Sequence, residues 1–394
     1  MASARSLTEA NLSASSRSRM RPCRSCVCTS SVNCSAHFQS SDQRHGGACA
    51  FSRTCAMLGR VSEHPGTSCD LAFLGPVYVD LVMTGFDALP VLGSEVHATA
   101  MHLSPGGTAT RAVAAARLGA RTALLSLAGH DLFGDRLVAD LQQLAPAGLD
   151  LTGLVRSDAT PTPVSVAVVA GGDRTFLTYE QPRWASPVQL PDWRATPRSL
   201  HLDVSDPVPA WVSGLRSAGT ELVGGVGFVD DAGWGERLRR HLADVDVFVP
   251  NDDEAQRATG TPTPEAAAAA LAEHVGVAVV TRGARGAVAA GAQGWVEVDG
   301  AGPEVLGSLA AEPVVDTTGA GDVFAAALMA GGLEGWSLTQ RVEAAVLCSG
   351  LAVRRPGGAS GAPDAAALRT WWDAAPAEGR RRLAHLEAWV TRGA

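Results

Sequence analysis

Apolar runs of strand length alternate with apolar stretches of helix length through most of the chain. The run LAFLGPVYVDLVM, which begins at residue 71, predicts a buried strand. After it, GGTATRAVAAARLGA predicts a turn with a helix, and RTALLSLAG predicts a second strand. The alternation recurs in VDVFVPN, PTPEAAAAALAEH, GVAVVTRG and DVFAAALMAG. Strands that alternate with helices are typical of a parallel sheet covered on both faces, so we predict an α/β fold.

Two segments do not follow this alternation. Residues 94–103, SEVHATAMHL, alternate in polarity, and residues 163–181 read as a hairpin that turns at Gly171, Gly172 and Asp173. We predict that both segments form a small antiparallel sheet, which acts as a lid over the site. In such folds the ligands lie at the carboxyl ends of the parallel strands.

The composition of the first 65 residues differs from that of the rest. Residues 1–65 are rich in Ser, Arg and Cys and show no helix or strand period. The run CRSCVC suggests zinc binding, but it lacks a second CxxC pair, so we favour a disordered extension, or one that precedes a true start at Met57. We predict one domain over residues 66–370, closed by a charged, Ala-rich helix over residues 371–394.

Charge and cysteine placement limit the partners of the protein. The net charge of -8 argues against a nucleic-acid partner, since binding phosphate backbones needs clustered cations. No apolar run approaches the ~18 residues of a membrane span. Seven of the eight Cys lie in the first 69 residues, so the predicted domain does not depend on disulfides. We therefore expect a cytoplasmic protein without a nucleic-acid or membrane partner.

The stretch VVDTTGAGDVFAAALMAG, residues 314–331, places a lone carboxylate where a glycine-rich turn becomes a helix. Gly319, Ala320 and Gly321 come just before the predicted helix, whose first N–H groups have no intrahelical partner. This turn predicts an anion hole for a phosphate. Asp322 beside it is placed to deprotonate an attacking hydroxyl. An ordinary N-cap Asp after a glycine turn is the alternative.

The whole run is more specific than a GxGD motif. DTTGAGDVFAAALMAG resembles the C-terminal signature of the ribokinase-like (PfkB-type) carbohydrate kinase family, and the resemblance extends from Leu71 to Pro363. It implies a three-layer α/β/α sandwich with a mainly parallel central sheet and a small antiparallel β lid. It also implies transfer of the γ-phosphate of ATP to a primary hydroxyl of a sugar or sugar acid, with Asp322 as general base and Gly319, Ala320 and Gly321 as anion hole.

Two further segments resemble the nucleotide side of the family's site. By resemblance, Asn251 and Glu254 of VFVPNDDEA organise Mg²⁺ through water, together with the ATP phosphates. In VVTRGARGA, Thr281 and Gly283 would lie against ATP, and Gly286 would shape the turn. Without the resemblance, these segments read as a solvated acidic loop and a turn.

The resemblance also assigns the acceptor side. Asp80, in LGPVYVD, occupies the position of an Asp that binds sugar hydroxyls. Gly106 and Gly107, in SPGGTATRAVAAARLGA, would let the backbone approach the sugar. Thr110 aligns where the family usually has Asn, and Tyr78 where it often has Asn. These departures leave open which sugar is bound.

Two more features follow from the resemblance or from the predicted lid. Many relatives bind a monovalent cation such as K⁺, and here Asp316 with the carbonyls of Thr318, Ala352 and Gly357 would form its site. The edge of the lid predicts a homodimer interface, since an exposed strand edge favours pairing.

Three functions fit the sequence, and none uses a Walker-type loop, because GxxxxGK[ST] is absent. The first is the sugar kinase. The second is a nucleoside kinase of the same fold, with Tyr78 and Phe176 as walls for a base. The third is a non-catalytic sugar-binding descendant, which we favour least because Asp322 is intact.

Overall fold

The computed structural model describes residues 69–392, except residues 87, 90, 146, 171–172, 182–192, 228–232 and 293. The chain divides into two units, residues 1–62 and residues 63–394, and every described residue belongs to the second. The extension predicted over residues 1–65 therefore lies outside the described residues.

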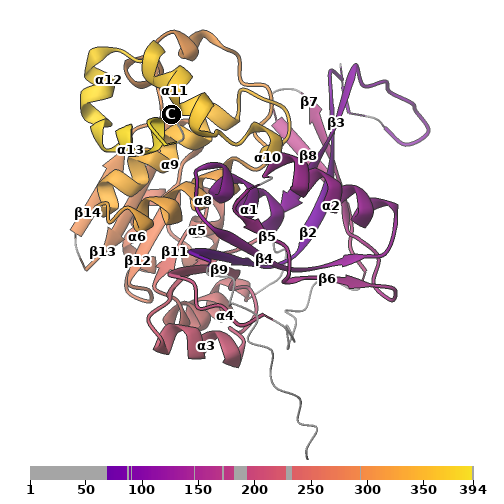
Figure 1. Ribbon diagram of the computed structural model, residues 1–394, viewed down its shortest axis with the longest axis horizontal. Coiled ribbons are helices and arrows are strands. Elements are labelled where there is room, and N and C mark those ends of the chain that lie inside the picture. The colour runs from indigo at the N-terminus through magenta and orange to yellow at the C-terminus, as the bar shows by residue number, and fades with distance from the viewer. Residues whose placement is uncertain are drawn as a thin grey trace, which may run out of the picture. The chain divides into compact units, whose positions relative to one another are not determined.

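A ten-stranded sheet forms the centre of the described unit, in the order β14-β13-β12-β11-β10-β9-β1-β4-β5, with β6 also paired to β4 (Figure 1). Neighbours from β5 to β12 are parallel, while β13 and β14 continue the sheet antiparallel. The strands are β1 (Leu71–Leu74), β4 (Thr122–Gly129), β5 (Leu149–Asp150), β6 (Leu154–Ser157), β9 (Ser199–Asp203), β10 (Glu221–Gly225), β11 (Val247–Phe248), β12 (Val277–Thr281), β13 (Ala287–Gly291) and β14 (Gly294–Val298).

Both faces of the central strands of this sheet are buried. In β1, Leu71 and Phe73 belong to one apolar core and Ala72 and Leu74 to the other, because successive strand side chains point to opposite faces. Burial on both faces explains why the central strands read as continuous apolar runs.

Helices cover each face of the sheet (Figure 1). The helices that contribute to the first core are α1 (Thr108–Arg117), α2 (Leu132–Leu144), α7 (Pro303–Leu306), α8 (Ala320–Leu333), α9 (Leu338–Ala352), α10 (Gly358–Gly361), α11 (Ala365–Ala374) and α13 (Glu387–Val390). Those that contribute to the second are α3 (Ala210–Ser217), α4 (Trp234–His241), α5 (Asp252–Thr259) and α6 (Pro264–Leu271). The predicted three-layer α/β/α sandwich with a mainly parallel sheet is confirmed.

A smaller sheet has the order β3-β2-β7-β8, from β2 (Val77–Thr84), β3 (Ala100–Gly107), β7 (Val164–Ala170) and β8 (Asp173–Tyr179). The predicted β7–β8 hairpin is present, although its turn residues 171–172 lie outside the described residues. The expectation of a purely antiparallel lid is wrong, since β2 and β7 are parallel. The chain builds α1, α2 and β4–β6 between them, and such a crossover returns a strand in the same direction.

Two predicted strand boundaries also differ. The run from residue 71 forms two strands, because Pro76 has no N–H for the sheet ladder. Gly75 still donates to the Leu125 carbonyl (3.2 Å), and beyond Pro76 the chain enters the small sheet. The lid strand predicted over 94–103 begins only at Ala100 and continues to Gly107, so the expected glycine turn belongs to β3. The break carries the chain from the main sheet to the strand that bears Asp80.

The single C-terminal helix predicted over residues 371–394 is wrong. The described residues there form the end of α11, then α12 (Ala377–Arg382), a 3₁₀ turn (Ala384–Leu386) and α13. Ala375 is extended (ψ 142) before Pro376, as expected for a residue that precedes proline. Other 3₁₀ turns span Leu242–Asp244, Gly283–Arg285 and Gly307–Ala311.

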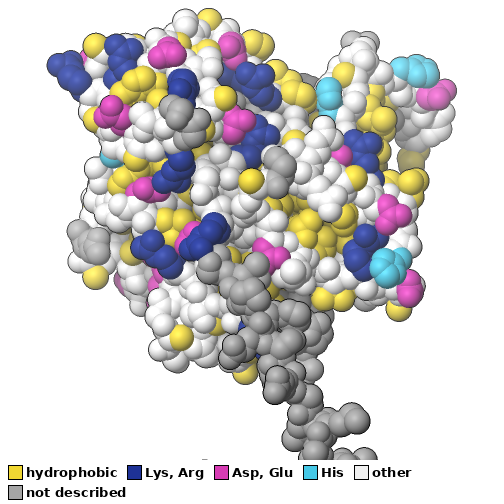
Figure 2. All heavy atoms as spheres, in the orientation of Figure 1, with side chains coloured by type: hydrophobic (Ala, Val, Ile, Leu, Met, Phe, Trp, Pro, Cys, Tyr) yellow, Lys and Arg dark blue, Asp and Glu magenta, His cyan; other side chains and the backbone are white. Residues whose placement is uncertain are grey.

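The described surface carries mixed charge. On the face seen in Figure 2, arginine and acidic side chains are interspersed, with apolar side chains between them. Within the described part of the chain, no helix combines the length and apolar character of a membrane span.

Candidate active site

The glycine turn before α8 packs tightly against neighbouring residues at Gly319 and borders free space at Gly321. Gly319 is the N-cap residue in the left-handed conformation (φ 73), and no side chain caps the helix. A Cβ on Gly319 would lie 2.7 Å from Gly358 Cα, so only glycine fits there. A Cβ on Gly321 would meet no atom within 4 Å. Ala320 and Gly321, which we predicted to precede the helix, lie inside the first turn of α8, where uncapped N–H groups favour an anion.

Asp316 holds this turn in place. It is buried, with Oδ1 accepting from the Thr318 N–H (2.8 Å) and Oδ2 from the Gly357 N–H (2.8 Å). The carboxylate thereby ties the turn to the segment that precedes α10. The carbonyls of Ala352 and Gly357 also accept backbone N–H groups. The role of this group of atoms in cation binding therefore stays a prediction.

Asp322 lies in the first turn of α8 and forms an ion pair with Arg111 of α1. Asp322 Oδ1 is 2.7 Å from Arg111 Nη2, and both side chains are about four-fifths buried, with exposed fractions of 19% and 21%. Arg111 is not among the residues predicted from the sequence. The only signal for it was its place beside Thr110, in the N-terminal signature.

Asp80 lies in β2 and is only 7% exposed. A Cβ on Gly106 would overlap its carboxylate, so the glycine makes room for this side chain. The pKa of Asp80 is raised to about 7, chiefly by burial and further by the negative charges of Asp322 and Asp316. The predicted acceptor-binding carboxylate and the predicted base are therefore close in space.

Gly107 and Thr110 pack around the turn. Gly107 has φ 59, and a Cβ there would lie 2.8 Å from the Pro76 carbonyl oxygen. The Thr110 hydroxyl donates to the Pro105 carbonyl (2.9 Å), and its methyl carbon lies 3.1 Å from the Cβ position of Gly319. Thr110, which we predicted to contact the acceptor, thus packs against the glycine turn, and its hydroxyl is already bonded to the Pro105 carbonyl.

Asn251 and Glu254 begin α5 at the carboxyl end of β11. The Asn251 side chain accepts from the Glu254 N–H (2.8 Å), and Glu254 Oε2 accepts from the Asn251 N–H (2.9 Å), which is a capping box. Burial raises the pKa of Glu254 to about 7, although the Asn251 hydrogen bond and the charge of Arg111 lower it. The charge of Asp322 raises it, so Glu254 is within electrostatic reach of that residue.

These donors fit a water-mediated metal. Among the described residues no group of three His, Cys, Asp or Glu could hold a metal ion by itself. Mg²⁺ prefers oxygen ligands and usually keeps several waters, so the side-chain oxygens of Asn251 and Glu254 are of the type that would hold it.

The predicted nucleotide turn follows β12. Thr281 pairs with Asn251 in an isolated parallel bridge, which places these two predicted ATP residues side by side. Gly283 (φ 55) is the first residue of the 3₁₀ turn that follows, and Gly286 (φ 84) comes directly after that turn. A Cβ on Gly286 would overlap the Val298 carbonyl oxygen, whereas one on Gly283 would meet nothing within 4 Å.

The model of the pfkB family of carbohydrate kinases matches residues 76–365, most of the described unit. The chain belongs to this family. A relative, 2-dehydro-3-deoxygluconokinase of Bacillus subtilis, is 27% identical over 278 residues, which cover 66% of this chain and 83% of that protein.

Solved structures share the pfkB fold. Ribokinase II of E. coli with ATP and Mg²⁺ has a TM-score of 0.62 and 22% identity, and the match covers 77% of this chain and 99% of that one. Arabidopsis thaliana ribokinase with ribose and ATP has a TM-score of 0.61 and 21% identity, covering 77% and 98%. Every residue predicted for the site lies within the family match.

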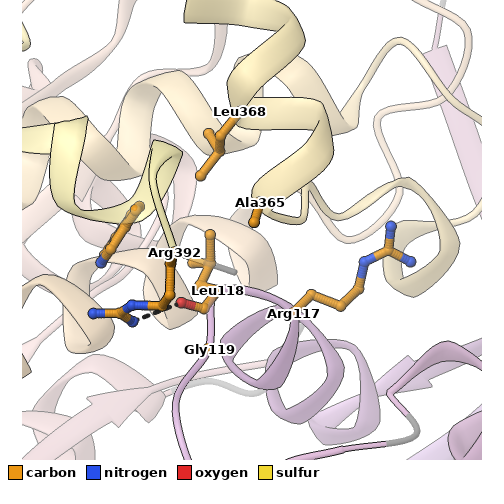
Figure 3. Close-up of a pocket in the computed structure, with 7 residues that line it drawn as sticks. Arg117, Leu118, Gly119, Ala365, Leu368 and Arg392 are labelled. Atoms are coloured by element: carbon orange, nitrogen blue, oxygen red, sulfur yellow. Dashed lines mark hydrogen bonds between the residues drawn. The ribbon is translucent and has the colours of Figure 1, made fainter. Parts of the chain in front are cut away.

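A separate cavity of about 190 Å³ in this pfkB chain is not assigned to the site. Arg117 and Arg392 extend from it in opposite directions, with Leu118, Ala365 and Leu368 between them (Figure 3). Both arginines are engaged, by Asp364 and by the Leu118 carbonyl. None of the residues predicted for the active site lines this cavity.

Proposed function

We propose that this pfkB family protein transfers the γ-phosphoryl group of ATP to a primary hydroxyl of a sugar or sugar acid. The observation that supports this best is the closeness of two carboxylates from distant elements. Asp322 sits at the open N-terminus of α8, and its charge raises the pKa of Asp80 in the small sheet. One carboxylate can thus bind acceptor hydroxyls while the other takes the proton of the attacking hydroxyl.

The remaining residues have supporting roles in this proposal. The N–H groups at Gly319–Gly321 stabilise charge on the moving phosphoryl group. Asn251 and Glu254 orient water toward the metal, and Thr281 with Gly283 contacts the nucleotide. Bound Mg²⁺ would neutralise charge on the phosphate oxygens.

The acceptor class rests on similarity. The B. subtilis relative is named for 2-dehydro-3-deoxygluconate, and the Arabidopsis neighbour was solved with ribose and ATP. ATP and Mg²⁺ were bound in the E. coli neighbour. A nucleoside acceptor remains the second candidate. Its apolar walls would be Tyr78, whose hydroxyl donates to Glu180 (3.2 Å), and Phe176, which is 45% exposed on β8.

We also propose a homodimer through the small sheet and a K⁺ site at Asp316. Large apolar side chains are exposed on the two outer strands of the small sheet, β3 and β8, namely Met101, Phe176, Leu177 and Tyr179. Unpaired edges with apolar side chains favour association. Sedimentation of wild-type protein and Leu177→Glu tests the dimer, and turnover in K⁺ against Na⁺ tests the cation.

The test of the kinase function is ADP release from MgATP across a panel of sugars, sugar acids and nucleosides. Asp322→Asn runs beside the wild type, with Asp364→Asn as a control from the N-cap of α11. We expect one sugar or sugar acid to give turnover that Asp322→Asn abolishes and Asp364→Asn keeps. Turnover with nucleosides alone would support the second candidate. ATP binding without any turnover would support a non-catalytic descendant.

A further inference from the structure

Arg111 brings a guanidinium to the centre of the proposed site. Its Nη2 contacts Asp322 Oδ1 at 2.7 Å, in the first turn of α8. Thr110, directly before it, lies against the Cβ position of Gly319 at 3.1 Å. The start of α1 and the anion hole are therefore in contact, and the cation is held beside the space that a phosphoryl group would occupy.

The ion pair conflicts with the role of Asp322 as a base. A guanidinium in contact with a carboxylate favours its charged form and opposes proton uptake. Asp322 can accept the acceptor proton more readily once this cation has moved to another anion. The proposed reaction supplies such an anion, because the γ-phosphate enters the same space.

Arg111 also has unused hydrogen-bonding capacity. Its Nε is buried and has no hydrogen-bond partner among the described residues. Arg341, an arginine of similar burial, instead uses its Nε on the Leu328 carbonyl (2.9 Å) and both terminal nitrogens on Glu221. A guanidinium fork with spare donors suits a phosphoryl group, which it binds through two parallel hydrogen bonds.

The charge around Arg111 supports the same role. Asp80, Asp316 and Asp322 are close enough for the last two to act on the first, so the site holds several carboxyls. Arg111 pairs with Asp322 within this group. The negatively charged γ-phosphoryl group of ATP needs positive charge when it enters among these carboxyls, and Arg111 supplies it from the protein.

We propose that Arg111 is a catalytic residue, whose guanidinium moves from Asp322 to the γ-phosphoryl group of bound ATP. This rests on the proposed kinase function. The acceptor oxygen bonds to the γ-phosphorus, and the bond from that phosphorus to the β,γ-bridging oxygen breaks, so that ADP leaves with the electron pair. The acceptor proton passes to the Asp322 carboxylate. Arg111 stays charged and neutralises the equatorial oxygens of the phosphoryl group.

The test compares Arg111→Ala and Arg111→Lys with Arg117→Ala. Arg117 is a matched control, since it lies on the same helix, is 19% exposed and pairs with Asp364 at 3.2 Å outside the site. We expect kcat to fall about 10³-fold in Arg111→Ala, with the Kd of MgATP nearly unchanged, because an arginine on the transferring group is worth about 10³ to 10⁵ in kcat. Added guanidinium should restore part of the rate, and Arg117→Ala should keep it.

A binding measurement separates chemistry from structure. Arg111→Ala should weaken the complex of MgADP, aluminium fluoride and acceptor as strongly as it lowers kcat, and leave MgADP alone unaffected. Arg111→Lys keeps the positive charge but lacks the two-pronged guanidinium, so its kcat and its affinity for this complex should lie between those of the wild type and Arg111→Ala. If the alanine variant folds poorly, the lysine variant still tests the proposal.

Three results would overturn the proposal. Unchanged kcat in both Arg111 variants would refute it while the kinase function stands. A loss of kcat that occurs only with acidic acceptors would show that Arg111 binds the carboxylate of the acceptor instead of the phosphoryl group. No turnover of the wild type with any acceptor, despite MgATP binding, would refute the kinase function and this role together.

Discussion

Replacing Asp80 by Asn tests the electrostatics of the site through protein stability. Asp80 is 7% exposed, and its pKa is raised from 3.8 to about 7 by burial and by Asp322 and Asp316. A carboxyl pKa that is higher in the folded protein means that the folded state binds the proton more tightly. The protein without ligands is therefore most stable below the unfolded pKa near 4, and it loses stability as the pH rises to about 7.

The size of the effect follows from the shift. One pKa unit corresponds to 1.36 kcal/mol, so about three units give about 4 kcal/mol over the whole range. About 2.5 kcal/mol of this falls between pH 5 and pH 8.5. Asp80→Asn has no such charge, so its free energy of unfolding relative to wild type should rise by that amount between these two pH values. Acceptor affinity should fall, since the amide accepts fewer hydroxyls.

Urea denaturation at both pH values, without nucleotide or acceptor, measures the difference. Asp244→Asn is the control, because Asp244 is exposed on a 3₁₀ turn outside the site. If the free energies of unfolding of wild type and Asp80→Asn changed equally with pH, Asp80 would not be a buried carboxyl whose pKa is raised by burial and by its neighbours.

Three further substitutions probe the site. Gly106→Ala would push the Asp80 carboxylate aside. Because a displacement of about 1 Å lowers the rate about 10²-fold, kcat/KM for the acceptor should fall by about that factor, while the KM of ATP stays the same. Gly214→Ala is the control, since it places a methyl group in open space on α3 and should leave the kinetics unchanged. Gly321→Ala should keep or raise the melting temperature, because alanine is the better helix former. It should also lower kcat about tenfold or more, because the methyl group enters the space of the anion. A kcat equal to that of the wild type would contradict the anion hole. Asp316→Asn should lower the free energy of unfolding in urea by about 1 to 3 kcal/mol, since one backbone N–H loses its acceptor; an unchanged value would show that another group replaces it.

The sequence contained most of the architecture, because the alternation of apolar runs is local. The division of the first run into β1 and β2 was hidden, since both strands are apolar and only Gly75 and Pro76 mark the break. The parallel pairing of β2 with β7 depends on the path of the chain between them, which local pattern does not record.

The candidate site divides in the same way. The resemblance placed Asp80, Asp322 and the glycine turn in one region, and the structure brings them together. The capping role of Asn251 and Glu254 was readable from the Asn-x-x-Glu spacing. The role of Arg111 could not be predicted from the sequence, because a helix sequence does not show which distant carboxylate an arginine will contact.

The most direct test of the central claim is the rate of phosphoryl transfer in a single turnover. Wild type and Asp322→Asn are mixed with saturating MgATP and the acceptor found in the panel, then quenched, with MgATP affinity measured separately. The account predicts a transfer rate that falls by about 10² to 10⁴ in Asp322→Asn at unchanged MgATP affinity. An equal transfer rate in both proteins would contradict the role of Asp322 as the base.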